Sequence, residues 1–233
     1  MSALRSSLGW RVLRIALIVL LAVLLLPYLL VPLYLVVDPV STPMLARWLT
    51  GARVERIVVP LDRMAASLPR SVIAAEDARF CTHRGADWQS VQVALGDAED
   101  GAELRGASTI TQQTAKNLFL WSGRSFVRKA LEFPLALWMD FILPKRRVLE
   151  IYLNIAEWGP NGEFGAEAAA RRAFGRPARD LSRGESALLA AVLPNPVRRN
   201  ARQPAPTVRR LAGLYQVRSE AALDSCIRPR RAP

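Results

Sequence analysis

The longest unbroken apolar stretch runs from residue 15 to residue 37 and contains no charged side chain. In a helix, these residues span roughly 34 Å, enough to cross the hydrocarbon core of a bilayer. Pro27 and Pro32 fall inside the stretch, and a membrane helix tolerates such prolines. The pattern predicts one transmembrane helix. A cleaved signal peptide is the alternative, but the run is long for one and no small-residue cleavage site follows it.

Beyond residue 38, apolar positions recur mainly every three or four residues, as on one face of a helix. Segments with this spacing are 61–68, 71–80, 109–120, 126–143, 144–158 and 182–193. Two of them open with a capping-box pattern, Thr109 with Gln112 and Ser182 with Glu185. The pattern predicts a mainly α protein.

Prolines and glycines within and between these segments refine the predicted helix boundaries and bends. Pro69 interrupts the first helical run, so Ser71 is expected to cap a new helix. Pro134 should bend the helix over residues 126–143. Ile57–Val59 is the one short β-like run, and the glycine-rich, acidic segment 96–107 reads as a surface loop.

Charge narrows the expected partners. The chain carries 32 Lys and Arg against 20 Asp and Glu, a formal net charge of +12, so an anionic partner is expected. Arg5, Arg11 and Arg14 precede the apolar stretch, and Asp38 follows it. The positive-inside rule then places residues 1–14 in the cytoplasm and the rest of the chain outside the membrane. Nucleic acid is the default partner for such an excess of positive charge, but the apolar N-terminal stretch points elsewhere.

Few side chains are available for acid–base chemistry. With one histidine and two cysteines, the chain cannot build a zinc site of the usual kind, and proton transfer must fall mainly on carboxylates, lysines or tyrosines. Cys81 and Cys226 would lie in an oxidising compartment, where their pairing is left open by the sequence. The side-by-side acids Glu76 and Asp77 are the first candidates.

Taken singly, each candidate also has a purely structural interpretation. Adjacent acids are commonly surface residues, and a lone histidine is commonly structural. Arg128, Lys129 and Glu132 have the spacing of surface ion pairs along one helix. The segment 108–113 could do no more than begin a helix.

Taken together and in order, five segments resemble the five sequence blocks of the family 51 peptidoglycan glycosyltransferases. They are EDARFCTHRG, GASTITQQTAKN, RKALE, KRRVLEIYLN and ESALLAAVLPNP. The short, anchored chain is similar to the monofunctional members, because it contains no S-x-x-K or K-T-G motif of a penicillin-binding transpeptidase. The resemblance implies a lysozyme-like helical glycosyltransferase domain with a membrane-facing jaw subdomain.

The resemblance also implies a domain organisation. The expected parts are a cytoplasmic N-terminus at 1–14, a transmembrane helix at 15–37, a linker at 38–53, the glycosyltransferase domain at 54–202 and an Arg/Pro-rich C-terminal tail at 203–233. The segment 126–143 is expected either to lie in the membrane interface or to be a buried core helix.

Members of that family join lipid-linked disaccharide-peptide units and release polyprenyl diphosphate with inversion at the anomeric carbon. By position, Glu76 matches the general base that takes the proton from the attacking hydroxyl. Glu132 matches the second acidic position, expected to orient the bases or to hold a divalent cation (Mg²⁺ or Mn²⁺) on the diphosphate; no organic cofactor is expected. The positions expected to bind the diphosphate are Lys116, Arg124, Arg128 and Lys129. The positions expected to line or shape the cleft are Asp77, Phe80, His83, Gly85, Ser108, Thr109, Gln112, Gln113 and Asn154.

The expected partners are lipid II, the growing lipid-linked glycan, the membrane and a cell-wall synthesis complex, with no nucleic acid. The implied location is the cytoplasmic (inner) membrane, with a single pass and a periplasmic catalytic domain. Two alternatives are a membrane-anchored glycan-cleaving enzyme, which would also use a glutamate, and a non-catalytic partner of cell-wall assembly.

Overall fold

The computed structural model describes residues 2–90, 92–93, 108–123, 125–222 and 224–228, with side chains from residue 9 onward. Two short strands pair in parallel, β1 (Glu55–Arg56) and β2 (Glu163–Phe164). The helices of the body are α2 (Thr42–Leu49), α3 (Ser67–Glu76), α5 (Ile110–Phe119), α6 (Phe126–Ile142), α7 (Lys145–Ile155), α8 (Ala166–Phe174), α9 (Arg183–Val192) and α10 (Pro206–Glu220). The predicted mainly α class is confirmed.

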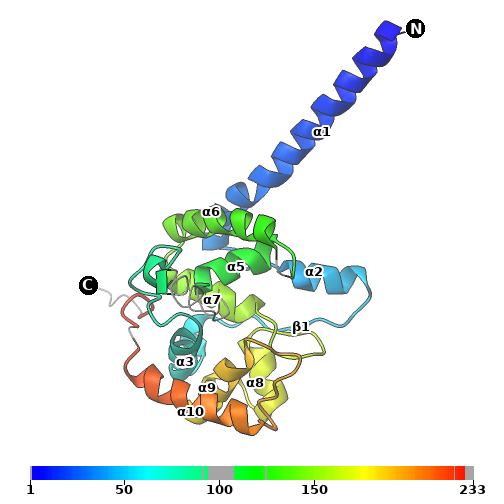
Figure 1. Ribbon diagram of the computed structural model, residues 1–233. Helices are drawn as coiled ribbons and strands as arrows, with labels where there is room; N and C mark the ends of the chain where they lie inside the picture. Colours follow the sequence, from blue (N-terminus) through cyan, green and yellow to red (C-terminus); the bar gives the residue numbers. More distant parts are fainter. Residues whose placement is uncertain (1, 91, 94–107, 124, 223, 229–233) are drawn as a thin grey trace.

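The N-terminal helix α1 (Ser2–Leu30) leaves the body as a straight rod and continues into the short 3-10 helix η1 (Val31–Leu35) (Figure 1). Residues 9–35 are apolar and long enough to cross a membrane, and almost none of that surface is buried against the protein. Soluble core helices bury an apolar face, so this exposure favours a membrane-spanning role.

The helices of the body form layers that follow one another from the end next to the N-terminal helix. Helix α6 lies at the end next to η1, helices α5 and α7 lie beneath it, and α8, α9 and α10 form the opposite end (Figure 1). Helix α3 packs against both α9 and α10. Large apolar side chains from these layers form one continuous core, which includes Leu68, Ile73, Ile110, Met139, Leu149 and Leu153.

Both predicted capping boxes are confirmed. The Thr109 hydroxyl accepts the backbone N–H of Gln112 at 3.1 Å, and the Gln112 side chain accepts the backbone N–H of Thr109 at 3.0 Å. Ser182 and Glu185 make the same reciprocal pair at the start of α9. These contacts satisfy amide groups that have no partner inside the helix, which explains why the two helices begin where the sequence placed them.

Two local predictions were wrong, and a third is not tested by the described residues. Helix α3 begins at Ser67, not after a cap at Ser71, because Pro69 falls in its first turn, where a missing N–H costs nothing. The β-like run 57–59 is not a strand; β1 lies just before it, and the backbone N–H of Val59 instead donates to the side chain of Asn154 at 2.9 Å. The predicted loop at 96–107 lies outside the described residues.

The folded body also exceeds the predicted borders of 54 and 202. Within the predicted linker, Ser41 and Met44 are fully buried, and the Thr42 hydroxyl donates to the carbonyl of Leu120. Within the predicted tail, α10 buries Val208 and Ala212 against α9. Both segments were taken as peripheral because they are short or rich in arginine, yet each packs its few apolar residues into the body.

Helix α6 combines the two alternatives considered for its segment. Leu135, Ala136 and Met139 are buried in the core, whereas Phe126 and Phe141 are 97% and 77% exposed. The indole N–H of Trp138 donates to the carbonyl of Tyr28 in the apolar N-terminal helix at 3.0 Å. One face of α6 is therefore core, and the other is an apolar surface beside the anchor.

We expect this exposed face to bind lipid. In a chain that lacks residues 1–30, Phe126→Ser with Phe141→Ser should weaken binding to anionic vesicles about tenfold or more, because each phenylalanine contributes about 1.5 kcal/mol or more when it leaves water. Val217→Ser, at another exposed apolar position, on α10, is the control. Equal binding by the two variants in a sedimentation assay would show that the α6 face does not touch the membrane.

Candidate active site

Glu76 is the last residue of α3 and faces a cavity of about 210 Å³. Ser108 and Thr109, just before α5, line the same cavity. The other residues of its wall include Asp77, Arg79, Asp87, Ser90 and Arg218. The end of α3, the residues just before α5 and helix α10 thus all line the cavity that Glu76 faces.

Among the described residues, only one of the two carboxylate oxygens of Glu76 accepts a hydrogen bond. Gln113 donates its side-chain N–H to Oε2 at 2.8 Å, and the hydroxyl of Tyr152 donates to the Gln113 carbonyl oxygen at 2.9 Å. Tyr152 therefore fixes which way the amide of Gln113 points. The second oxygen, Oε1, is buried and has no hydrogen-bond partner among the described residues.

Burial raises the pKa of Glu76 above its ordinary value, because a charge is poorly solvated inside the protein. The hydrogen bond from Gln113 and the positive charges of Lys116 and Arg199 act in the opposite direction, and the charge of Asp77 adds a small further rise. The net pKa stays raised, so Glu76 is a stronger proton acceptor than a surface carboxylate.

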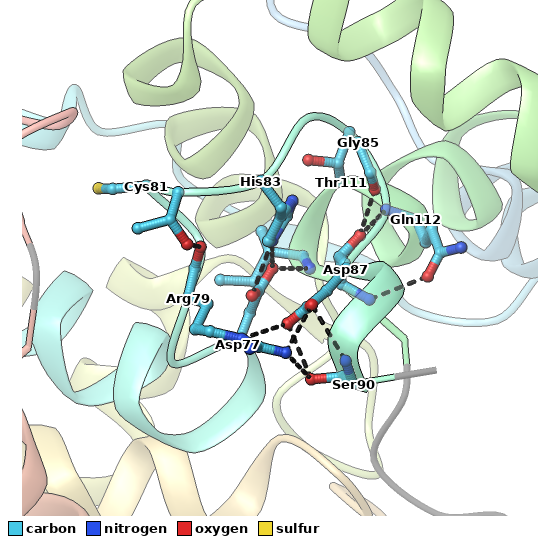
Figure 2. A network of polar contacts seen from close by, with 12 residues as sticks. Asp77, Arg79, Cys81, His83, Gly85, Asp87, Ser90, Thr111 and Gln112 are labelled. Carbon is cyan, nitrogen blue, oxygen red and sulfur yellow. Dashed lines mark hydrogen bonds and ion pairs between the residues drawn. The ribbon is translucent and has the colours of Figure 1, made fainter. Parts of the chain in front are cut away.

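Asp77 has a different environment from its neighbour. His83 donates from Nε2 to Asp77 at 2.9 Å, and the backbone N–H of Ile110 donates to Oδ2 of the same carboxylate at 2.9 Å (Figure 2). Lys145 lies 3.5 Å from the other ring nitrogen of His83, which fits an acceptor at that position. Asp77 therefore joins the end of α3 to the start of α5.

Arg79, Asp87 and Ser90 form a second polar network beside this one (Figure 2). Arg79 donates two hydrogen bonds to Asp87, at 2.9 and 2.7 Å. The pKa of Asp87 is lowered: burial would raise it, but hydrogen bonds from Ser90 and Arg79 outweigh burial. We had not singled out these residues; the D-x-x-S spacing of a helix cap was the available signal.

The loop between the two networks packs tightly on α6. Gly85 has a φ of 71°, and a β-carbon there would lie 2.8 Å from the carbonyl oxygen of Ala136. The Thr109 hydroxyl donates to the carbonyl of Gly85 at 2.6 Å. Phe80 is fully buried, with the Lys145 ammonium 4.6 Å from its ring centre. Glycine is required at position 85 by both its backbone conformation and its packing.

Glu132 is the centre of a cationic cluster on α6. Its side chain is 3% exposed, and each of its oxygens is paired at 2.5 Å, one with Arg128 and the other with Lys129. Lys129 also donates to the hydroxyl of Ser108 at 2.9 Å, which connects the cluster to the wall of the Glu76 cavity. Unlike an exposed pair, this buried carboxylate fixes the positions of its two cations.

The charge of Lys116 interacts with the carboxylates of both Glu76 and Glu132. Burial lowers its pKa; the charges of Glu132 and Glu76 raise it, and those of Arg128 and Lys129 lower it. The charges of both carboxylates therefore act on this one ammonium group. Arg124, the fourth predicted cation, lies outside the described residues.

The described residues do not fit a resident divalent cation at Glu132. Such an ion needs free carboxylate oxygens, and both oxygens of Glu132 already accept hydrogen bonds from cations. In the part of the chain that the structure describes, no three His, Cys, Asp or Glu side chains gather closely enough to hold a metal. The geometry favours an orienting role for Glu132.

Asn154 lies away from the Glu76 cavity. Its side chain donates to the carbonyl of Val59 and accepts the backbone N–H of the same residue, both at 2.9 Å. It fastens the segment after β1 to α7, which is a structural function. Gln112 is likewise occupied by its capping contact with Thr109.

Three further residues near the site were missed by sequence reasoning. The charge of Arg199 lowers the pKa of Glu76. The pKa of Tyr215 is raised mainly by burial and further by the charge of Glu76. Arg218 lines the cavity. Tyr215 and Arg218 lie on α10, inside the predicted tail. A short final helix was predicted in this segment, and the apolar spacing of Val208, Leu211, Ala212 and Tyr215 was the signal that it packs on the body.

The comparisons with known proteins agree with this geometry. The sequence profile described as "Transglycosylase" matches residues 43–218. A protein of Nitrobacter hamburgensis is 60% identical over 229 residues, covering 98% of this chain and 99% of the relative. A protein of Rhodopseudomonas palustris is 60% identical over 222 residues (95% and 94%), and one of Agrobacterium fabrum is 53% identical over 205 residues (87% and 90%). Each bears the name biosynthetic peptidoglycan transglycosylase. The chain belongs to the transglycosylase family.

Proposed function

We propose that the protein is a peptidoglycan glycosyltransferase that polymerises lipid II into glycan strands for cell-wall synthesis. The name shared by its relatives and the match over most of the chain support this assignment. The observation that carries the mechanism is Glu76, which lines a cavity, has one buried carboxylate oxygen without a partner among the described residues, and interacts with the charge of the partly buried Lys116.

In the proposed reaction, Glu76 takes the proton from the 4-hydroxyl of the incoming lipid-linked unit. The freed oxygen forms a bond to the anomeric carbon of the donor, whose bond to the lipid diphosphate breaks with inversion. The proton then leaves Glu76 for water, and polyprenyl diphosphate is released. A sugar hydroxyl is a weak nucleophile, so positioning a base contributes roughly 10²–10⁴-fold to such a step.

The leaving diphosphate needs positive charge more than it needs a proton. Lys116 is proposed to contact it directly, because the charges of both Glu76 and Glu132 act on this partly buried cation. Arg128 and Lys129, held by Glu132, are proposed to complete the cationic wall, with Arg124 as a further contact. Fixed charges that need no rearrangement stabilise a developing anion most effectively.

The remaining residues are proposed to keep the base in place. Gln113 and Tyr152 orient the carboxylate of Glu76. Asp77 and His83 hold the start of α5 against the end of α3. Ser108 and Thr109 form the polar wall of the cavity.

The setting of the reaction is proposed to be the outer face of the cytoplasmic membrane. The apolar helix fits a single-pass anchor, and the arginines that precede it favour a cytoplasmic N-terminus. The catalytic body would then be periplasmic, with α6 on the side of the body next to the anchor (Figure 1), where we expect it to meet the lipid surface. Recruitment into a larger cell-wall synthesis complex is a further expectation of this setting.

One assay separates this proposal from a glycan-cleaving enzyme and from a non-catalytic partner. Purified full-length protein in detergent micelles is incubated with lipid-linked disaccharide-peptide, or with preformed glycan. We expect high-molecular-weight polymer and free polyprenyl diphosphate from the first substrate, and no shortening of the second. Shortened glycan would support cleavage, and unchanged substrates in both arms would support a non-catalytic role.

A further inference from the structure

Cys81 and Cys226 form a disulfide that joins two distant parts of the chain. The bond answers the pairing question that the sequence left open, and it spans 145 residues of sequence. Cys81 lies on the loop between Asp77 and His83, at the edge of the polar network around the site (Figure 2). Because the chain has two cysteines, this is the single disulfide it can form within itself.

The loop that carries Cys81 forms one side of the active site. Asp77 accepts the backbone N–H of Ile110, and the carbonyl of Gly85 accepts the hydroxyl of Thr109, so both ends of the loop contact the start of α5. The same carboxylate accepts from His83 across the loop. Any release of this loop would change the setting of Glu76, the residue immediately before it.

The other end of the disulfide lies in a firmly docked segment. Asp224 accepts a hydrogen bond from Arg70 of α3 at 2.8 Å and one from Arg228 at 2.9 Å. Arg146 of α7 donates to the carbonyl of Ile227 at 2.6 Å, and the side chain of Ile227 is buried. Residues 224–228 are therefore fixed to two helices of the body and give the disulfide a rigid anchor.

We propose that the Cys81–Cys226 disulfide positions the Asp77–His83 loop for catalysis, so that the oxidised protein holds a formed active site and the reduced protein holds a loosened one. This inference rests on the proposed function for its kinetic consequences. Both cysteines are positioning residues, since they act through Asp77 and His83 and do not touch the reacting groups.

Formation of the bond has a simple balance. Two thiols lose two protons and two electrons, and a thiol–disulfide oxidant gains them to become a dithiol. A disulfide-exchange oxidant of the oxidising compartment outside the cytoplasmic membrane is the chemical class required. Full activity would therefore be reached only after the chain has crossed the membrane and been oxidised.

The direct test compares the oxidised full-length protein with Cys81→Ser/Cys226→Ser. We expect kcat for polymerisation to fall about tenfold, since small misplacements of a catalytic group are costly, and KM to change little. The acid limb of the pH–kcat profile should move to lower pH, because water entering around Glu76 weakens the burial that raises its pKa. The charged groups that act on Glu76, namely Lys116, Arg199 and Asp77, and the tyrosines on which it acts, Tyr152 and Tyr215, are not substituted in this variant.

A disulfide that closes so long a loop also stabilises the folded chain, so the control must lower stability without touching the loop. Val208→Ala removes buried apolar volume between α10 and α9 and serves this purpose. We expect it to keep the wild-type kcat and pH profile below its unfolding temperature. Equal losses of kcat in both variants would overturn the positioning role, as would a double variant that loses thermal stability alone.

Folded wild-type protein treated with a dithiol reductant provides a second route if the double variant does not fold. Hydrogen exchange at residues 78–85 should accelerate on reduction and slow again on reoxidation, while exchange in α9 stays constant. This readout does not need activity, so an inactive but correctly responding protein would count against the proposed function and not against the inference. Unchanged exchange in the loop would overturn the inference.

Discussion

Glu76→Gln is expected to nearly abolish glycan polymerisation, lowering kcat by about 10²–10⁴-fold. Glutamine has nearly the same shape, and its carbonyl oxygen accepts the hydrogen bond that Gln113 donates to Glu76. The substitution removes the proton acceptor and leaves its surroundings in place. We therefore expect the variant to fold and to bind lipid-linked substrate as the wild type does, with the whole loss in kcat.

The matched control for this substitution is Asp180→Asn. Asp180 is a half-exposed carboxylate in the 3-10 helix η3 (Ala178–Asp180), and it does not line the Glu76 cavity. It should keep full activity. The measurement is the rate of polymer formation at saturating substrate, together with substrate binding by the glutamine variant. Turnover of Glu76→Gln at the wild-type rate would refute the assignment of the base.

Lys116→Met is expected to have the second largest effect, a fall in kcat of about 10²–10³-fold. Methionine keeps the length and much of the volume of the lysine side chain, so the change is mainly the loss of a buried charge. In the proposed reaction, that charge stabilises the diphosphate as its bond to the anomeric carbon breaks. Its loss should slow the chemical step more than it weakens the binding of substrate.

Two comparisons sharpen this prediction. Lys116→Arg keeps the charge and should retain more activity than Lys116→Met, although a guanidinium does not replace an ammonium in a buried position without rearrangement. Lys129→Met removes a cation whose side chain is 42% exposed, so solvent screens it and the loss should be smaller. If the kcat of Lys116→Met matched that of Lys129→Met, the diphosphate contact would not centre on Lys116.

The sequence predicted the parts of the fold that depend on neighbouring residues. The capping boxes at Thr109 and Ser182 satisfy amide groups within three residues, and they were found where expected. The start of α7 after Pro144 was likewise predictable, because proline suits the N-terminus of a helix. The apolar helical segment over residues 9–35 is long and apolar enough to cross a membrane, as the uncharged run at residues 15–37 predicted.

Features that depend on distant residues were harder to predict. The disulfide joins residues 145 positions apart, and no local pattern encodes that approach. Helix α10 has a narrow apolar stripe among arginines and serines, so its packing on α9 was not evident, and neither was the approach of Arg218 to the cavity. The strand was misplaced because β-propensity at residues 57–59 competes with the partner that tertiary structure offers at residues 55–56.

The candidate site shows the same division. Motif order located Glu76, Lys116 and Glu132, but the sequence could not say that Glu132 uses both oxygens on Arg128 and Lys129. That contact pattern favours an orienting role over a metal-binding one. The tyrosines and Arg199 around Glu76 come from three other segments, and only the folded chain brings them together.

The central claim is that Glu76 is a base with a buried carboxylate whose pKa responds to the charge of Lys116. It is tested most directly by the pKa of Glu76, measured by ¹³C NMR on full-length protein with labelled glutamate carboxyl carbons, and assigned with Glu76→Gln. We expect the pKa of Glu76 to lie above the ordinary value for glutamate, and to rise further in Lys116→Met, because the positive charge of Lys116 lowers it in the wild type. An ordinary pKa that does not respond to the loss of Lys116 would contradict the account.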